Sequence, residues 1–229
     1  RCERCENVAE QVYRCVDCFL GPMCCQTCLV SQHRHNSLHG VQVWDRGFWH
    51  KESLANLGLT LNLGHDGRKC PVAFDEPRRL TVVHSHGIHE LRMRFCACLD
   101  DELEGTPDSL QLIANGMWPG TWDKPLTAFT IDVMKEFHLL SLQVQMSAQD
   151  FHRYLQRRTD NVQTDQVPNR YRELLRTMQE FIWVRAVKRT AQKPARRMAM
   201  GSLAVLCPAC PQPGVNMNPA APPRRYDQR

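Results

Sequence analysis

The stretch "YRCVDCFLGPMCCQTC" (Tyr13–Cys28) places five cysteines within sixteen residues and decides how the first part of this chain folds. Four of the five form two C-x-x-C pairs, a third pair precedes the stretch, and three histidines follow it. Paired cysteines followed by spaced histidines are typical of zinc sites. The pairs are Cys2/Cys5, Cys15/Cys18 and Cys25/Cys28, and the histidines are His33, His35 and His39.

Disulfides are the alternative use of these cysteines, because the chain holds an even number of them, twelve in 229 residues. This density, about 5%, lies below that of small disulfide scaffolds. The sequence also has no N-x-S/T glycosylation acceptor. A redox C-x-x-C is not expected three times in a row ahead of histidines. We therefore predict that these residues hold zinc.

The order of the ligand pairs indicates two tetrahedral zinc sites. We favour a cross-brace, in which pairs one and three share one ion and pairs two and four share the other, because short intervals with few apolar residues need interlocking. The spacing also permits sequential wiring. Zinc would supply most of the folding free energy of such a module. The cross-brace gives Cys2, Cys5, Cys25 and Cys28 as site one, and Cys15, Cys18, His33 and His39 as site two.

Two further residues of the cluster are spare candidates for metal binding. Cys24 makes a poorer C-x3-C knuckle with Cys28 and is expected to be a small buried residue instead. His35 has an H-x3-H spacing with His39 that zinc sites also use, so the choice of His33 over His35 is a preference.

The middle of the chain predicts strands and loops. Residues 40–44 ("GVQVW") indicate a short strand, and residues 52–71 are loop-rich. Residues 80–98 predict a β-hairpin that turns at Ser85-His86-Gly87. Cys96 and Cys98 would share one face of its second strand, because side chains alternate along a strand. Such a C-x-C can aim both sulfurs at one ion.

A third metal site needs partners for this C-x-C. The C-x-x-C knuckle Cys207/Cys210 is the expected pair and would give four thiolates. His65 and Cys70 are the alternative, either in this site or in a fourth one with a hairpin histidine such as His89. Histidines at such a turn are more often polar surface residues than ligands.

From about residue 106 the pattern is helical. Ser147 and Asp150 resemble a capping box at the start of a helix, and Pro168 suits the first turn of a longer one. In that helix an apolar stripe is expected to face the core: Tyr171, Leu174, Leu175, Met178, Phe181 and Ile182.

The expected fold class is therefore α+β. A small zinc-stabilised cross-brace module is followed by a β-hairpin region and by a helical segment that a C-terminal zinc knuckle closes. The boundaries are 1–50 for the double-zinc cluster, 51–105 for the hairpin region, 106–206 for the helical region and 207–229 for the knuckle and proline-rich tail.

Charge suggests a nucleic-acid contact. The net charge is +5, and the segment 182–197 carries six basic residues and no acidic one. Such a helix can follow phosphates, although a solvated helix end is the plain alternative. The expected contacts are to phosphates, with weak sequence preference. The six residues are Arg185, Lys188, Arg189, Lys193, Arg196 and Arg197.

The sequence contains no recognised catalytic motif, such as the P-loop, G-x-S-x-G or H-E-x-x-H. No apolar run approaches the ~20 residues that span a bilayer. We expect neither catalysis, nor a small-molecule substrate, nor a membrane partner.

Ten segments occur in a telling order: "YRCVDC", "CQTC", "HRHNSLHGVQVW", "LGLTLNLGH", "GIHELRMRFCAC", "PLTAFT", "LQRRTDN", "RYREL", "VKRTA" and "GSLAVLCPACPQPGVN". Together they resemble the CxC-type cysteine-cluster region that precedes the catalytic part of Kyakuja–Dileera–Zisupton (KDZ) transposases of fungi. The resemblance extends from Tyr13 to Asn216.

This resemblance implies a nuclear, zinc-binding module that handles nucleic acid. Its partners would be DNA and further copies of the transposase. The family's ribonuclease-H-like catalytic core comes later in the chain, so no catalytic residue carries over to this sequence. Since the chain begins at Arg1 and not at Met, we expect a fragment or remnant of such a transposase.

The runner-up function is a protein-interaction module that resembles ZZ or B-box zinc folds. The basic helix discriminates between the two. A continuous positive face that joins it to Arg153, Arg157 and Arg158 favours DNA, whereas scattered or paired charges favour a protein partner.

Overall fold

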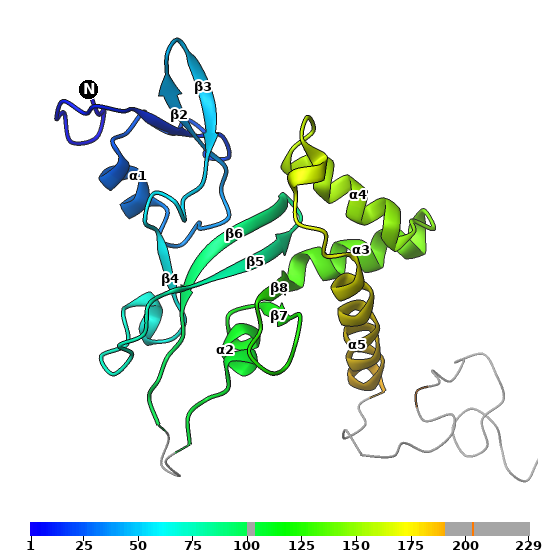
Figure 1. Ribbon diagram of the computed structural model, residues 1–229. Coiled ribbons are helices and arrows are strands. Elements are labelled where there is room, and N and C mark those ends of the chain that lie inside the picture. The colour runs from blue at the N-terminus through cyan, green and yellow to red at the C-terminus, as the bar shows by residue number, and fades with distance from the viewer. Residues whose placement is uncertain (100–103, 191–202, 204–229) are drawn as a thin grey trace, which may run out of the picture. The chain divides into compact units, whose positions relative to one another are not determined.

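The computed structural model describes residues 1–99 and 104–190, together with residue 203 (Figure 1). The chain divides into two compact units, Arg1–Glu180 and Phe181–Arg229. The first unit contains two sheets and all the candidate metal ligands that the structure describes. Of the second unit, the structure describes the end of one helix and residue 203.

Three short antiparallel strands form the first sheet, in the order β1-β2-β3. They are β1 (Tyr13–Cys15), β2 (Val41–Asp45) and β3 (Phe48–Glu52), and helix α1 (Gln26–Gln32) joins β1 to β2 (Figure 1). The hydrophobic core beneath them holds nine buried residues, of which three are cysteines. Such a core is too small to hold short strands and a seven-residue helix by apolar burial alone.

Five strands form the second sheet, in the order β4-β6-β5-β8-β7. The central pair is the antiparallel hairpin that the sequence predicts, and it turns at Ser85 and His86. β4 pairs with β6 in parallel, and β8 pairs with β5 in parallel. The strands are β4 (Thr60–Asn62), β5 (Arg78–His84), β6 (Gly87–Arg94), β7 (Met117–Pro119) and β8 (Thr127–Thr130).

Several helices pack against this sheet. α2 packs against β7, and α4 packs against β6. The α-helices are α2 (Asp108–Ala114), α3 (Ile131–Gln143), α4 (Ala148–Thr159) and α5 (Tyr171–Arg189), and the short 3-10 turns are η1 (His65–Gly67) and η2 (Thr164–Gln166). None of the helices in the described ranges is long and apolar enough to cross a bilayer.

The hairpin presents two different faces, because side chains alternate along a strand. One face is apolar, and its buried members on β5 and β6 are Leu80, Val82, Leu91 and Met93. This face packs with Leu112 of α2 in one hydrophobic core. The other face is covered near the turn, where Val83 and Ile88 are buried, and is polar further along.

Several expectations about the elements are confirmed. The fold is mixed α+β, and the hairpin lies where its alternation indicates. Helix α4 begins after Ser147, whose side-chain oxygen accepts a hydrogen bond from the Asp150 N–H at 3.1 Å. This is the N-cap contact that the sequence predicts.

Other expectations differ from the structure. β1, β3 and β4 occupy segments without a strand signal, and β7 and β8 lie inside the stretch expected to be helical. All five are short and depend on pairing with neighbouring strands. Helix α5 begins at Tyr171, after Pro168 and not at it. In α5, Leu174 and Met178 are buried, but Leu175 and Ile182 are about two-fifths exposed, so the buried stripe is narrower than expected.

Gly87 makes the close approach of the hairpin to helix α4 possible. Its φ is +141°, and a Cβ built on it would lie 2.7 Å from the Thr159 Oγ1 atom. That hydroxyl accepts a hydrogen bond from the Ile88 N–H and donates one to the Leu155 carbonyl, both at 2.7 Å. These two hydrogen bonds hold the Thr159 hydroxyl in place, so it cannot readily move away from an added Cβ.

We expect Gly87→Ala to lower the free energy of unfolding by roughly 2 kcal/mol, because it adds steric overlap to backbone strain. Gly47→Ala is the matched control: its φ is +95°, but nothing lies within 4 Å of the added Cβ. Urea unfolding of both variants separates the two contributions. Equal losses of stability in the two would contradict the proposed contact with Thr159.

Candidate metal centres

The first group of potential ligands joins the N-terminal loop to the start of helix α1. Its four thiols come from Cys2, Cys5, Cys25 and Cys28, and their sulfurs all lie within 4.8 Å of one another. The Cys5 and Cys25 sulfurs are 3.8 Å apart. Cys25 is the N-cap residue of α1, so the helix start fixes the direction of the third knuckle.

The second group joins β1 to the end of α1 and the loop that follows. It contains Cys15, Cys18, His33 and His39, again with ligand atoms within 4.8 Å. The Cys18 sulfur lies 3.4 Å from His33 Nε2 and 3.4 Å from His39 Nδ1. The Cys15 sulfur lies 3.5 Å from the same His39 nitrogen. These two sets are the ones that the cross-brace groups together.

The ring of His33 is held in the orientation that a ligand needs. Its Nδ1 lies 2.8 Å from the Leu29 carbonyl oxygen and can donate its proton there. That tautomer leaves the Nε2 lone pair directed at Cys18. Gly40, next to His39, donates its N–H to the Asp17 carboxylate at 2.6 Å. Backbone contacts thus position both histidines.

The third group lies at one end of the five-stranded sheet. It contains His65, Cys70, Cys96 and Cys98, within the same 4.8 Å limit. The His65 Nε2 atom is 3.3 Å from the Cys96 sulfur and 3.4 Å from the Cys98 sulfur. The Cys70 sulfur is 3.8 Å from Cys96 and 3.7 Å from Cys98.

The parallel pairing of β4 with β6 creates this third group. Both strands run in the same direction, so the chain leaves them at the same edge. His65 follows β4 and Cys96 follows β6 within a few residues, and the two therefore meet. Between them Gly64, with φ +101°, approaches Cys96 so closely that a Cβ would lie 3.2 Å from the Cys96 Cβ.

One sequence expectation about the C-x-C is wrong, and another falls partly outside the described residues. Strand β6 ends at Arg94, so Cys96 and Cys98 lie after the strand and are not part of its alternation. Their partners in the structure are His65 and Cys70, which were the alternative, and the expected partners Cys207 and Cys210 lie outside the described residues.

Gln111 of helix α2 is a positioning residue that the sequence analysis missed. Its side-chain oxygen accepts a hydrogen bond from the Cys96 N–H at 2.7 Å. Its amide nitrogen donates to the carbonyl oxygens of Cys96 and Thr106, at 2.9 and 2.8 Å. Gln111 therefore clamps the backbone that carries the Cys96 thiol. A mostly buried glutamine on a short helix gives no sequence signal of such a role.

The thiols within a group differ in acidity. Hydrogen bonds from the backbone N–H groups of Cys25 and Cys5 lower the pKa of Cys2 to about 5. Hydrogen bonding to Cys25 raises the pKa of Cys28 to about 12. Thiols held this close together cannot all carry negative charge unless a cation lies among them.

The third group shows the same contrast. Burial opposes the Cys70 thiolate, but backbone N–H groups of Ala97 and Val72 outweigh it and lower the pKa of Cys70 to about 6. Hydrogen bonding to Cys96 and to Cys70 raises the pKa of Cys98 to about 11. Each of these two groups thus favours one thiolate at the expense of a neighbour.

Three residues considered as metal ligands lie outside all three groups. Cys24 is fully buried, and burial raises the pKa of its thiol to about 11, which fits a small core residue. His35 is exposed. His89 lies on β6, where burial, followed by the charge of His84, lowers its pKa to about 4. Its Nε2 atom has no hydrogen-bond partner among the described residues.

The basic helix is described in part. Arg185, Lys188 and Arg189 are exposed at the end of α5. Lys193, Arg196 and Arg197 lie outside the described residues. On α4, Arg153 pairs with Asp150 at 4.0 Å, and Arg158 donates to the Tyr154 hydroxyl at 2.8 Å. Two of the three α4 arginines, Arg153 and Arg158, therefore contact other side chains of the same helix.

The comparison with protein families identifies the segment that contains the third group. Residues 54–163 match the family described as CxC2 like cysteine cluster associated with KDZ transposases. This segment is similar to the CxC2 family. It spans just under half of the chain. No curated protein and no solved structure matches the chain.

The CxC2 segment, residues 54–163, contains all four members of the third group and the whole five-stranded sheet. The first two groups lie ahead of it in the chain. The family likeness suggested by the ten sequence segments is therefore confirmed for the part that holds the C-x-C. All three groups are placed to hold metal ions.

Proposed function

We propose that this chain is a zinc-stabilised, non-catalytic region of a KDZ-type transposase that contacts DNA. The observation that carries the proposal is the set of three groups, each with four thiol or imidazole ligands, within and immediately before a transposase-associated segment. A nuclear location in a fungal cell and self-association within the transposase belong to the same proposal.

The spacing of the ligand atoms supports zinc. Zn–S bonds of ~2.3 Å and Zn–N bonds of ~2.0–2.1 Å at tetrahedral angles separate two sulfurs by about 3.8 Å, and a sulfur from a nitrogen by about 3.6 Å. The sulfurs of Cys70 and Cys98 are 3.7 Å apart, and those of Cys5 and Cys25 are 3.8 Å apart. The sulfur–nitrogen distance between Cys15 and His39 is 3.5 Å. Thiolate and imidazole ligands in tetrahedral groups select zinc over magnesium or calcium.

The basic end of helix α5 is the proposed DNA contact. Arg185, Lys188 and Arg189 are exposed, and the Arg185 guanidinium lies 5.7 Å from the centre of the Phe181 ring. No base-reading motif accompanies them, so the contacts would be to the phosphate backbone, with weak sequence preference.

Replacing Arg185, Lys188 and Arg189 together by Ala is expected to weaken binding to duplex DNA. Each neutralised phosphate releases counterions, so the slope of log K against log salt should fall by about three. The measurement is fluorescence anisotropy of a labelled random-sequence duplex with the full, zinc-loaded chain across a salt series. An unchanged affinity and slope would dismiss this helix as the contact, and wild-type protein that binds no duplex would reject the DNA function.

A protein-interaction module is the second candidate function, and one observation favours it. The loop after Cys18 exposes Phe19 and Leu20 by 94% and 87%, next to the second ligand group. Exposed apolar side chains on a zinc-stabilised loop suit the docking of a protein. Intact metal groups combined with no DNA binding would make this the preferred function.

A further inference from the structure

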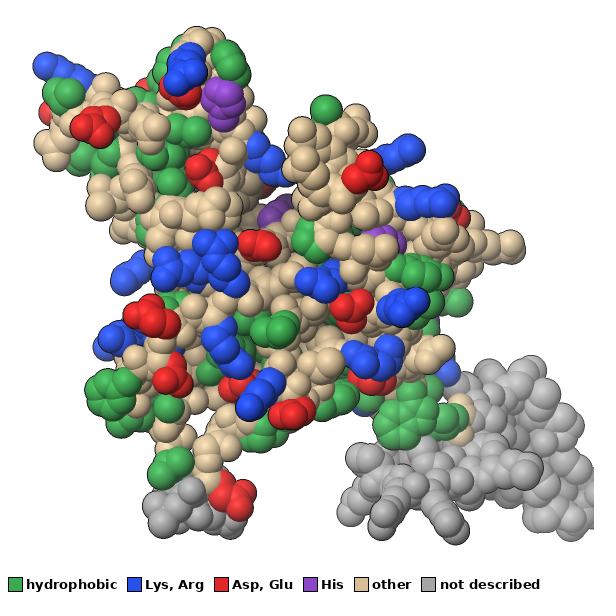
Figure 2. All heavy atoms as spheres, in the orientation of Figure 1, with side chains coloured by type: hydrophobic (Ala, Val, Ile, Leu, Met, Phe, Trp, Pro, Cys, Tyr) green, Lys and Arg blue, Asp and Glu red, His purple; other side chains and the backbone are tan. Residues whose placement is uncertain are grey.

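The polar half of the hairpin face carries a row of arginines. Arg79 of β5 lies directly opposite Arg92 of β6, and Arg94 is two residues further along the same face. Directly opposite side chains begin about 4.5–5.5 Å apart, and like charges at such positions destabilise a sheet. Figure 2 shows Lys and Arg side chains gathered over this part of strands β5 and β6.

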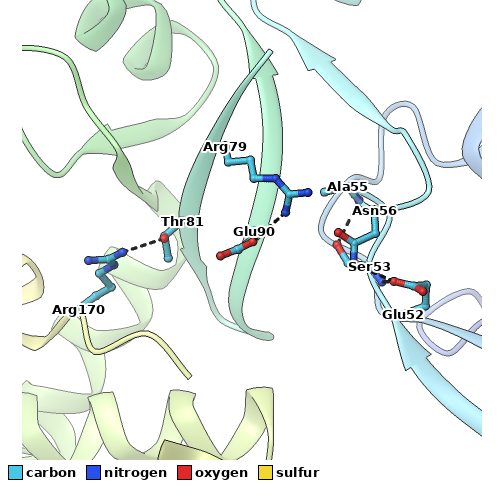
Figure 3. A network of polar contacts seen from close by, with 8 residues as sticks. All are labelled: Glu52, Ser53, Ala55, Asn56, Arg79, Thr81, Glu90 and Arg170. Carbon is cyan, nitrogen blue, oxygen red and sulfur yellow. Dashed lines mark hydrogen bonds and ion pairs between the residues drawn. The ribbon is translucent and has the colours of Figure 1, made fainter. Parts of the chain in front are cut away.

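The helical cover of the sheet ends where this row begins. Arg170, just before α5, reaches Thr81 of β5 and donates to its hydroxyl at 3.1 Å (Figure 3). Thr81 is 6% exposed beneath this contact. Two residues back on the same face, the Arg79 side chain is 59% exposed. On this face Arg79 is thus exposed, while Arg92 and Arg94 are partly exposed and Arg94 also donates to the Asp75 carbonyl oxygen at 3.4 Å.

Acidic groups neutralise only part of the row. Arg79 pairs with Glu90 at 3.2 Å, in a contact that is about half exposed on both sides (Figure 3). Exposed pairs of this kind contribute little and are readily exchanged for other anions. Arg94 donates weakly to the Asn62 side chain, at 3.5 Å. Within the described ranges, no acidic group forms an ion pair with Arg92.

A hollow at the edge of the sheet extends this basic surface. It has a volume of about 880 Å³ and lies along β4, whose Thr60 and Asn62 share the face of Arg92 and Arg94. Three basic residues and one acidic residue contribute to its lining: Arg34, Arg68, Lys69 and Asp66. The hollow is therefore predominantly basic and adjoins the arginine face through Thr60 and Asn62.

We propose that this open sheet face, formed by Arg79, Arg92 and Arg94 beside the basic hollow, binds the phosphate backbone of duplex DNA. This inference rests on the proposed DNA-binding function and adds a contact surface that is separate from helix α5. Three arginines against one glutamate give the face the charge that phosphates require, and the guanidinium group suits them.

The absence of aromatic residues from this face favours a duplex over a single strand. The polar side chains that share it are Arg79, Thr81, Glu90, Arg92, Arg94, Thr60 and Asn62, and none of them is aromatic. Proteins that hold single strands rely on such stacking. Contacts to phosphates position DNA without reading its sequence.

The test uses the full, zinc-loaded chain with Arg79→Gln, Arg92→Gln and Arg94→Gln combined. Binding to a random-sequence duplex is measured by fluorescence anisotropy across a salt series. We expect the slope of log K against log salt to fall by about three, at nearly one per lost contact. Replacement of the same three residues by Lys retains the charge and should retain most of the slope.

A control removes three positive charges elsewhere, with Arg46→Gln, Lys124→Gln and Lys135→Gln. These exposed residues lie on the β2–β3 turn, the β7–β8 loop and α3. This variant should keep the wild-type slope. Equal slopes for the sheet-face variant and the wild type would overturn the inference while leaving DNA binding through α5 intact. Equal losses in the sheet-face and control variants would also overturn it, because they would reveal only an effect of net charge.

Discussion

Replacement of Cys18 by Ser is expected to unfold the three-stranded sheet and helix α1 while the five-stranded sheet remains folded. Cys18 contacts both histidines of the second ligand group, so its loss removes the central thiolate of that group. The hydroxyl of serine is a poor zinc ligand, because zinc binds cysteine as a thiolate.

The size of this effect follows from how little else holds the module together. Its core has nine buried residues and includes three cysteines, and α1 has seven residues and no side-chain N-cap hydrogen bond. A structural zinc ion contributes about 10–16 kcal/mol of apparent binding free energy at neutral pH. A domain is typically stable by only about 5–15 kcal/mol in total. We therefore expect the module to depend on a bound metal ion.

Amide hydrogen exchange followed by NMR measures the outcome. Protection should disappear from β1, β2 and β3 and persist in β5 and β6. Cys24→Ala is the control, since Cys24 is more deeply buried than Cys18 but lies outside the ligand groups. Retained protection in β1 to β3 of Cys18→Ser, with undiminished zinc content, would refute a structural role for this metal.

The second large effect concerns the third ligand group. The purified chain is expected to hold three zinc ions in its described part, and Cys70→Ser is expected to lose one of them. The Cys70 thiol is buried and lies within 3.8 Å of both sulfurs of the C-x-C, so no exposed side chain can readily replace it. Without this ion, the chain after β6 loses its link to the loop after β4.

A matched variant decides which cysteines complete this group. Cys207→Ser combined with Cys210→Ser should retain the zinc ion that Cys70→Ser loses. The measurement is metal content per chain by mass spectrometry, with protein prepared under reducing conditions. If the double variant lost that ion and Cys70→Ser kept it, the C-terminal knuckle would be the true partner of Cys96 and Cys98.

Much of the metal chemistry could be predicted from the sequence because the relevant ligands are close together in the chain. Each C-x-x-C fixes the separation of its two sulfurs, and the order of the pairs limits how they combine. The eight residues of the first two groups could therefore be assigned without coordinates. His33 over His35 was a preference, and the structure brings His33 into the group through its contact with the Leu29 carbonyl.

Less of the fold beyond residue 50 could be predicted. The hairpin has a clear alternation and a turn, so its existence was evident. The three-residue strands β4 and β7 are too short to show an alternation of apolar and polar residues, and β8 lies within the stretch expected to be helical. β4 and β8 pair with β6 and β5, which are distant in the sequence, and β7 pairs with the short strand β8. Strand formation depends on such partners more than on local preference.

The sequence by itself predicted groups of cysteine and histidine ligands and a central hairpin, because short spacings and alternation are local properties. Only the tertiary structure decided which residues meet Cys96 and Cys98. The parallel pairing of β4 with β6 brings His65 and Cys70 to the edge where the C-x-C lies. The same pairing places Arg92 and Arg94 on an open face beside β4. Long-range strand pairing is a property of the whole sheet, and no segment of the sequence encodes it alone.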